Sequence, residues 1–291
     1  MLKEFPKISI ITPSFNDASF LEKTILSVID QEYPNLEYIV IDGGSTDGSV
    51  DIIKRYEGRI GYWVSEPDKG QYDALQKGFS RSTGEIMGWI NSDDMHHPGS
   101  LFTIAQIFSD HQQVNWLQGV PNMIDESGRI VYALTAGEID RYFFYGRKYI
   151  QSHRFIQQES TFWRRTLWEK AGNRISTEYK YAGDFDLWIR FFQFEKLYNF
   201  HALLGSFRYS RSGQASFENY QEYIRETLAI LEKYPLNKKE KRQMQYLDMF
   251  HTIEKNFHKL GSGLKNRLGL KETSVVNDRL NFDYRTQEFK M

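Results

Sequence analysis

The sequence carries three clusters of acidic, amide and hydroxyl side chains, and each one directly follows a short apolar run. They occupy residues 12–16, 42–47 and 91–94. Carboxylate oxygens are the ligands that hard divalent cations prefer in proteins, with substrate phosphates completing the coordination shell. Glycines beside a helix start also let an anion approach free backbone N–H groups. Together these clusters are typical of a site for a metal-bound phosphate compound.

Each cluster also has an ordinary structural explanation, which the residues alone leave open. The segment from Asp42 to Ser49, which reads DGGSTDGS, could be a glycine-rich turn whose aspartates cap the next helix. The segment NSDD, from Asn91 to Asp94, could be a turn or a helix cap before Pro98. What favours the functional interpretation is that three such clusters follow three strands of one predicted sheet.

A fourth acidic segment, Ala182-Gly-Asp-Phe-Asp186, opens an aromatic helix. A carboxylate at a helix start often serves as a cap that the helix dipole stabilises. Asp184 lies between a glycine and a phenylalanine, so it is also a candidate general base if it faces a cleft.

Several other chemistries find no support in the sequence. There is no Walker loop and no GxGxxG motif for a dinucleotide, and neither HExxH nor GxSxG occurs. The chain has no cysteine, which excludes disulfides, a thiolate nucleophile and cysteine-based metal sites. Carboxylates therefore remain the main candidates for catalysis.

The elements that must position these clusters follow from the apolar pattern. Strands are expected at about residues 8–12, 38–41, 60–64 and 86–90, and helices after Asn16 or Asp17, at 50–56, at 72–79 and from about 184. Strands that alternate with short helices predict βαβ units and a parallel sheet. Ligands bind beyond the carboxyl ends of such strands, where the polar clusters lie.

The rest of the chain divides by composition. The pattern loosens near residue 112 into shorter strands, so we expect a catalytic domain over 1–216, with halves at about 1–111 and 112–216. Residues 217–291 are predicted to form a helical extension. Between Glu232 and Glu272 there are ten Lys and Arg against five Asp and Glu, whereas the whole chain has a net charge of −1. The neutral total thus combines an acidic body with a basic tail.

Composition limits the partners further. The chain has 291 residues, with 37 basic and 38 acidic side chains, so a general nucleic-acid coat is not expected. No apolar run approaches the ~20 residues of a membrane span, and the N-terminus lacks a signal-peptide core. Eighteen tyrosines, 21 phenylalanines and six tryptophans form an aromatic excess, which could fill a core or stack against flat rings.

Read in order, the segments resemble the family 2 inverting glycosyltransferases of the GT-A fold. The similarity covers roughly residues 5–215 and six motifs in register. The matching segments are TPSFN at 12–16, YIVIDGGSTDGS at 38–49, EPDKGQYDALQKG at 66–78, GEIMGWINSDD at 84–94, QESTFWR at 158–164 and AGDFDLW at 182–188. The fold that the resemblance implies is α/β, with a Rossmann-like nucleotide-binding half, a mainly parallel central sheet and a helical C-terminal extension.

The resemblance implies a role for each matching position. Asp184 would be the catalytic base, Asp93 with Asp94 would hold Mn²⁺ or Mg²⁺, and Asp42 would accept a hydrogen bond from the base of the nucleotide. The nucleotide-sugar site would comprise Thr12, Pro13, Ser14, Asn16, Asp42, Gly43, Lys69, Gly70, Asp73, Ser92 and Asp93. The acceptor side would comprise Gln158, Glu159, Trp163, Asp186 and Arg208.

Three residues depart from the family pattern. Asn91 stands at the first acidic position of the DXD motif, and Gly183 precedes the expected base where many relatives carry Glu. Ser210 stands where some relatives have His, and Arg208 or Arg211 could replace that side chain.

The expected activity is transfer of a sugar from a nucleotide sugar, with UDP as the favoured carrier, to a glycan or lipid-linked saccharide of the bacterial cell surface, as in polysaccharide, O-antigen or capsule biosynthesis. A sugar-nucleotide nucleotidyltransferase and a catalytically degenerate nucleotide-sugar-binding protein are the alternatives. We expect a cytoplasmic protein whose basic tail can contact the inner face of the membrane. The donor sugar and the oligomeric state do not follow from the sequence.

Overall fold

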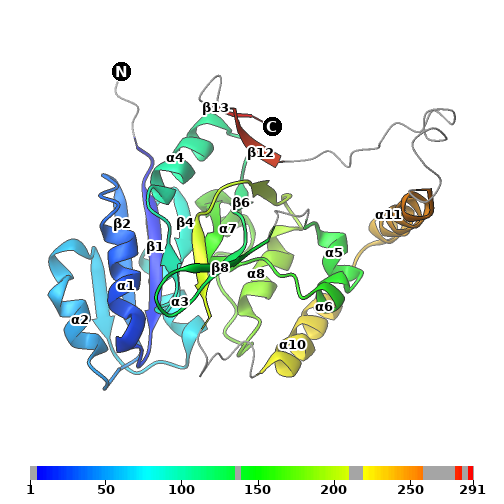
Figure 1. The fold of residues 1–291 in the computed structure, drawn as a ribbon. Coiled ribbons are helices and arrows are strands. Elements are labelled where there is room, and N and C mark those ends of the chain that lie inside the picture. Colours follow the sequence, from blue (N-terminus) through cyan, green and yellow to red (C-terminus); the bar gives the residue numbers. More distant parts are fainter. Residues whose placement is uncertain (1–4, 135–138, 210–218, 258–278, 284–287, 291) are drawn as a thin grey trace.

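The computed structural model describes residues 5–134, 139–209, 219–257, 279–283 and 288–290, and side chains up to residue 249. Its centre is a nine-stranded sheet in the order β13-β12-β10-β6-β9-β4-β1-β2-β3 (Figure 1). The strands are β1 Ile8–Ser14, β2 Leu36–Asp42, β3 Tyr62–Ser65, β4 Ile86–Trp89, β6 Trp116–Gln118, β9 Thr161–Arg164, β10 Tyr198–Phe200, β12 Arg279–Asp283 and β13 Glu288–Lys290. Only β9 and β13 run antiparallel to their neighbours. The predicted mainly parallel sheet is therefore confirmed.

Helices cover both faces of this sheet, as the alternating pattern predicts. The helices of the catalytic body are α1 Ala18–Ile29, α2 Ser49–Arg55, α3 Gln71–Arg81, α4 Ser100–Asp110, α5 Arg141–Tyr145, α6 Lys148–Ser152, α7 Arg165–Lys170 and α8 Gly183–Phe191. Short 3₁₀ turns lie at Glu57–Arg59 and Gln158–Ser160. No helix in the described part of the chain is long and apolar enough to cross a membrane.

Side chains of successive strand residues enter different cores, because they point to opposite faces of the sheet. In β1, Ile8 and Ile10 pack with α1, α2 and α4, whereas Ile11 packs with α3 on the other face. In β2, Val40 and Ile41 divide in the same way. Burial on both faces explains why these strands are continuous apolar runs.

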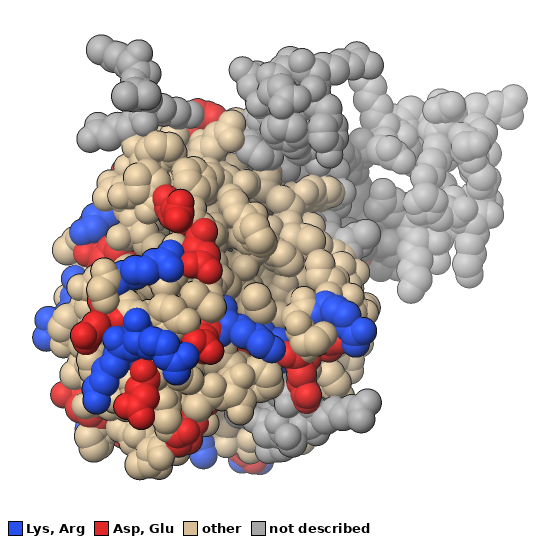
Figure 2. Space-filling view, turned by 60° about the vertical axis from the view of Figure 1, so that its left-hand side comes forward, with Lys and Arg blue, Asp and Glu red and all other residues tan. Residues whose placement is uncertain are grey.

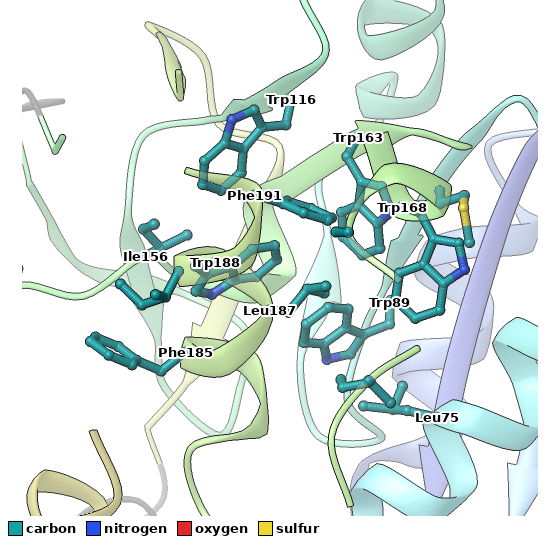
Figure 3. Packing of buried hydrophobic residues seen from close by; sticks show 14 of the residues in the cluster. Leu75, Trp89, Trp116, Ile156, Trp163, Trp168, Phe185, Leu187, Trp188 and Phe191 are labelled. Atoms are coloured by element: carbon teal, nitrogen blue, oxygen red, sulfur yellow. The ribbon is translucent and has the colours of Figure 1, made fainter. Parts of the chain in front are cut away.

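The core on the α3 face is dominated by tryptophan. The rings of Trp89 and Trp188 stack with centroids 5.5 Å apart and an interplanar angle of 7°, and Trp163 meets both edge-on (Figure 3). Trp116 stacks on the other side of Trp188. These contacts join α8 to β4, β6 and β9, and they account for much of the aromatic excess. Among the aromatic side chains within or beside the matching segments, Trp89, Trp163 and Trp188 are buried, whereas Phe15 is exposed.

A second, four-stranded sheet lies beside the large one, in the order β5-β11-β7-β8. Its strands are β5 Met95–His96, β7 Asn122–Ile124, β8 Ile130–Ala133 and β11 Gly205–Arg208. Strand β5 directly follows the acidic segment after β4, and β11 pairs with it. The small sheet therefore brings Arg208 next to the acidic residues at 91–94.

The C-terminal extension begins with α10 Tyr220–Lys233 and α11 Lys238–Phe257. Helix α10 packs against α8, and its Ile230 and Leu231 join the same core as the tryptophans. Further along, β12 extends the large sheet by pairing with β10, and β13 pairs with β12. The sequence predicts the two helices but not these two strands.

Candidate functional site

The first two polar clusters are joined by hydrogen bonds between their loops. The backbone N–H of Asn16 donates to the Ser45 hydroxyl at 2.8 Å, and the Asn16 amide oxygen accepts from Thr46 N–H at 2.8 Å. Asn16 has a φ of 51°, a left-handed conformation that asparagine tolerates better than most residues. The Asp47 carboxylate accepts from the N–H of Ala18 at the start of α1. These hydrogen bonds join the loops after β1 and β2 into one surface.

The Asp42 carboxylate holds the glycine-rich loop after β2 in place. Its buried carboxylate accepts from the N–H groups of Gly44 and Ser45 and from the hydroxyls of Ser45 and Ser65, at 2.5–3.1 Å. Both oxygens are therefore engaged in shaping the glycine-rich loop. Contact of Asp42 with a nucleotide base remains a prediction.

The other expected nucleotide-site residues lie at the same edge. Thr12, Pro13 and Ser14 are buried at the end of β1, and the Ser14 hydroxyl has no partner within the described structure. Gly43 leaves room for Asp68, whose carboxylate oxygen would lie 2.8 Å from an added Cβ. Lys69 and Gly70 are exposed just before α3, whereas Asp73 accepts from Lys69 N–H at 3.2 Å.

The third cluster separates into a buried and an accessible carboxylate. Asp94 is fully buried and accepts from the Asn91 amide at 3.2 Å, the Gln158 amide at 3.3 Å and the backbone N–H of Arg208 at 2.8 Å. Asp93 is only partly buried. Asn91 also accepts from Gln71 at 2.6 Å, so its amide serves as both donor and acceptor. An acid at position 91 could not donate to Asp94, which explains the departure from the family pattern.

Four acidic side chains around this cluster influence one another. Burial raises the pKa of Asp93 and holds the pKa of Asp94 well above its usual range. Burial and the charge of Asp93 raise the pKa of Asp17 to about 6. Burial, followed by the charges of Asp93 and Asp184, raises the pKa of Glu159 to about 8. These carboxyl groups therefore hold their protons more tightly than free ones do, and a bound cation would favour their ionised forms.

Arg208 is the internal counter-charge of this cluster. Its guanidinium is buried, donates to the carbonyl oxygens of Asp93 and Asp125 at 2.5 and 2.8 Å, and lies 4.8 Å from the ring centroid of Phe20. Burial lowers the pKa of Arg208, whereas Asp94 and Asp93 act to raise it. Arg208 thus interacts with the carboxylates of several aspartates.

The donor set fits a divalent cation that is shared with a substrate. Within the described residues, no three His, Asp or Glu side chains form a metal-binding group of their own. Asp93 nevertheless presents a partly accessible carboxylate beside Asp17 and Ser92, and in the described part of the chain Arg208 is the cation that interacts with Asp17, Asp93 and Asp94. One or two carboxylates with phosphate oxygens form the usual environment of Mg²⁺ in nucleotide enzymes.

Asp184 lies in the first turn of α8 but does not cap it, since the cap position belongs to Ala182. Its carboxylate accepts from Phe185 N–H at 2.7 Å, and the Tyr72 hydroxyl lies 3.3 Å away. Burial raises the pKa of Asp184 to about 6, although both hydrogen bonds act to lower it. A carboxyl group with this pKa can accept a proton near neutral pH.

Gly183 is explained by the neighbouring Tyr72. A Cβ at position 183 would meet three atoms of the Tyr72 ring at 2.8 Å, so the ring occupies the space that a side chain there would need. The Tyr72 hydroxyl also reaches the carbonyl oxygen of Tyr181 at 2.9 Å. Helix α3 therefore fixes the start of α8 through one aromatic side chain.

The loop before α8 is held from the other side by α10. The Glu226 carboxylate accepts from the backbone N–H groups of Lys180, Tyr181 and Ala182 at 2.8–2.9 Å. Three N–H donors on one carboxylate fix the loop that leads into Asp184. The extension expected to begin at residue 217 is thus an integral support of the candidate base.

The acceptor-side predictions fall into two groups. Gln158, Glu159 and Arg208 lie in the carboxylate cluster described above. Trp163 is instead buried in the tryptophan core, and Asp186 is buried in an ion pair with Arg190 at 2.9 Å. The structure does not bring these two side chains to the site. Ser210 and Arg211 lie outside the described residues.

Two residues of the site, Asp17 and Glu226, are not among the predicted site residues, and Tyr72 is predicted only as part of the matching segment EPDKGQYDALQKG. Asp17 was interpreted only as a helix cap, but its side chain makes no cap hydrogen bond and instead bonds to Ser92. The signal was present in the sequence, because Asp17 directly follows the TPSFN segment. Glu226 had no such signal, since its partners lie 44–46 residues away.

Two open hollows lie elsewhere on the surface. They measure about 380 and 470 Å³ and are formed where α5 and α10 approach the start of α11. Neither is lined by a residue of the carboxylate cluster, so we place the site by the carboxylates.

Comparison with known proteins identifies the family of the chain and its fold. Residues 9–175, more than half of the chain, match the model of Glycosyl transferase family 2. The chain belongs to this family, and its architecture is the GT-A fold.

Curated relatives match over parts of their length. An uncharacterized glycosyltransferase of Mycobacterium tuberculosis is 43% identical over 90 residues, 31% of this chain and 34% of the relative. The putative teichuronic acid biosynthesis glycosyltransferase TuaG of Bacillus subtilis is 39% identical over 92 residues, 31% of this chain and 36% of TuaG. An uncharacterized glycosyltransferase of Rickettsia prowazekii is 27% identical over 207 residues, 68% of this chain and 63% of the relative. The chain thus spans about a third to two thirds of the length of these relatives.

Solved structures share the fold at low sequence identity. A fragment of TarS of S. aureus in complex with UDP-GlcNAc superposes with a TM-score of 0.63 and 17% identity, covering 91% of this chain and 76% of the fragment. A mannosyltransferase of Pyrobaculum calidifontis in complex with GDP-Man and Mn²⁺ gives 0.61 and 16%, covering 80% and 66%.

Proposed function

We propose that this protein is an inverting glycosyltransferase that moves a sugar from a nucleotide sugar to a saccharide or lipid-linked saccharide. The observation that carries the proposal is the link that α3 makes between the acidic cluster and Asp184. Gln71 donates to the Asn91 amide oxygen at 2.6 Å, and the hydroxyl of the next residue, Tyr72, lies 3.3 Å from the Asp184 carboxylate. The start of one helix therefore lies between the two carboxylates, Asp93 and Asp184. One of them is suited to the diphosphate side and the other to proton transfer.

The donor side is the surface formed by the joined loops after β1, β2 and β4. We assign the nucleotide to the loops anchored by Asn16 and Asp42, and the diphosphate to Asp93. UDP is favoured as the carrier because TarS was solved with UDP-GlcNAc, whereas the GDP-Man complex of the mannosyltransferase keeps GDP open. The Asp94 carboxylate accepts three hydrogen bonds. In this proposal it positions Asp93 and does not itself bind the metal.

Mn²⁺ or Mg²⁺ held at Asp93 would offset the charge that develops on the leaving nucleoside diphosphate. Asp184 takes the proton from the acceptor hydroxyl as its oxygen attacks the anomeric carbon. The hydroxyl oxygen forms the new glycosidic bond while the bond to the diphosphate breaks. A single displacement inverts the anomeric configuration without a glycosyl–enzyme intermediate.

Two relatives suggest the acceptor class. TuaG is named for teichuronic acid biosynthesis, and a Mycobacterium bovis relative that is 28% identical over 191 residues is named for PGL/p-HBAD biosynthesis. Both names point to products of the bacterial cell envelope. We therefore favour a saccharide or lipid-linked saccharide of an envelope glycan as the acceptor.

The direct test is release of nucleoside diphosphate from a panel of UDP-sugars and GDP-sugars, with Mn²⁺, with Mg²⁺ and with a chelator. We expect metal-dependent release by the wild-type protein, stimulated by acceptor, and a product of inverted anomeric configuration by NMR. Asp184→Asn and Asp93→Asn should each lower turnover by roughly 10²-fold or more. The exposed Asp51→Asn in α2 is the matched control and should retain activity.

The alternatives give different outcomes in the same assay. Pyrophosphate release from a nucleoside triphosphate and a sugar phosphate would identify a nucleotidyltransferase. Binding of UDP without hydrolysis or transfer of any donor would identify a degenerate binding protein. Full activity of both Asp184→Asn and Asp93→Asn would refute the assigned roles.

A further inference from the structure

In the first three turns of α11, acidic residues lie on the face toward the catalytic body and basic residues lie on the outer face. The two acids of residues 238–249 lie on the side that meets the catalytic body, where Glu240 pairs with Arg141 at 2.8 Å and Asp248 pairs with Lys148 at 2.9 Å. Met244 and Leu247 share this partly buried side. The inner face is therefore occupied and electrically neutralised.

The outer face carries only positive charge. Its three cationic side chains are all exposed, and among the described residues none makes an ion pair; they are Lys238, Lys239 and Arg242. Lys241 instead lines a hollow beside α10, at the edge of the inner face. Cations in the first turns of a helix oppose the helix dipole, so this placement does not serve helix stability. The face seen in Figure 2 is different, because there basic and acidic side chains lie next to one another.

Two large apolar side chains continue the outer face. Tyr246 is 61% exposed and Met249 is 48% exposed. With Lys239 and Arg242 they have the spacing i, i+3, i+7 and i+10, which places all four on one stripe of the helix. Exposed cations followed by exposed apolar side chains on one stripe are the pattern of helices that lie on an anionic bilayer.

We propose that the outer face of α11 docks the protein on a membrane surface rich in anionic phospholipid. Lys238, Lys239 and Arg242 contact the phosphate groups, and Tyr246 and Met249 enter the interfacial layer. The pattern favours a bilayer over nucleic acid, because exposed apolar side chains continue the cationic stripe and the whole chain has a net charge of −1. The inference does not depend on which sugar the enzyme transfers.

The test is flotation of the full chain with vesicles of phosphatidylcholine alone and with 30 mol % phosphatidylglycerol, added as roughly the anionic fraction needed for a negative surface potential. We expect binding only to the anionic vesicles and weakening of that binding at high salt. Changing Lys238, Lys239 and Arg242 to Gln should lower partitioning by roughly a hundredfold. Tyr246→Ser with Met249→Ser should leave a weaker association that salt abolishes.

The matched control removes the same charge elsewhere, by changing the exposed Lys54, Lys170 and Arg174 to Gln. This variant should float like the wild type. Equal flotation of the α11 variant and the wild type, or equal binding to neutral and anionic vesicles, would overturn the proposal. Retention by a DNA duplex without vesicle binding would overturn it in favour of nucleic acid. Circular dichroism and nucleotide binding, measured on every variant, separate docking from misfolding and from loss of the proposed activity.

Discussion

At the scale of single residues, Asp184 is the proposed general base, and its burial makes the carboxyl group costly to ionise. Burial raises its pKa from 3.8 to about 6, even though it accepts a hydrogen bond from Phe185. A structural cap gains nothing from such a shift, whereas a general base near neutral pH does. We therefore expect the Asp184 carboxylate to lower the stability of the folded protein while it serves catalysis.

Asp184→Asn should make the protein more stable at neutral pH while it abolishes transfer. As pH rises, the carboxyl ionises near 3.8 in the unfolded chain but only near 6 in the folded one, so a penalty grows between these values. Two pKa units correspond to about 3 kcal/mol, which is an upper bound for this partly exposed group. Urea denaturation at pH 7.5 should show the gain, and the gain should vanish near pH 4. Equal or lower stability of the variant at pH 7.5 would count against a strained base.

The same pKa sets the acid limb of the activity profile. Since the base must be ionised, kcat/KM should fall as pH drops below about 6. The Tyr72 hydroxyl acts to lower this pKa, so Tyr72→Phe should move the acid limb to higher pH. Tyr56→Phe, which removes a hydroxyl bonded to Glu22, is the control and should leave the profile in place. A limb that stays in place or moves to lower pH in Tyr72→Phe would disprove the coupling.

At the scale of elements, α8 is positioned by three independent contacts. The tryptophan core sets its distance from the sheet, Tyr72 on α3 packs over Gly183, and Glu226 on α10 holds the preceding loop. The last contact makes the C-terminal extension part of the catalytic machinery. Damage to α10 should therefore affect the chemistry as well as the fold.

Glu226→Ala should lower kcat more than it raises KM for the donor. Loss of three backbone partners loosens the loop before Asp184, and a small misplacement of a base costs roughly tenfold or more. The Glu226 charge also acts to raise the pKa of Asp184, so the acid limb should shift to lower pH. Glu222→Ala, one turn earlier and paired only with Arg225 on the surface, is the control. An unchanged kcat and profile in Glu226→Ala would show that α10 does not support the base.

The elements that the sequence predicts well are those with strong local signals. Strands of continuous apolar residues such as β1 and β2, and the polar turns that end them, lie where the pattern places them. Strands β12 and β13 are not predicted, because β12 pairs with β10 some 80 residues away and β13 pairs only with β12 among the described strands. Trp163 was assigned to the acceptor side because the motif contains it, but only packing shows that its ring faces the core. Motif membership therefore did not determine side-chain direction.

At the scale of the whole molecule, the fold brings distant segments to one sheet edge. Asp17 follows β1, Asp93 follows β4, Glu159 precedes β9 and Arg208 ends β11, so four separate parts of the chain build the carboxylate cluster. The three polar clusters after β1, β2 and β4 could be placed at this edge from topology alone. Arg208 is predicted for the site through the family resemblance alone, whereas the contribution of Glu226 is not predicted, since it depends on the packing of α10.

The division of labour between Asp93 and Asp184 is the central claim, and calorimetric binding of UDP and GDP with and without Mn²⁺ tests it most directly. We predict that the wild type binds one of these nucleotides in a Mn²⁺-dependent manner. Asp184→Asn should bind it with unchanged affinity but without turnover of the donor, whereas Asp93→Asn should lose roughly tenfold or more in affinity and should no longer respond to Mn²⁺. Equal, metal-independent affinity in all three proteins would contradict the account.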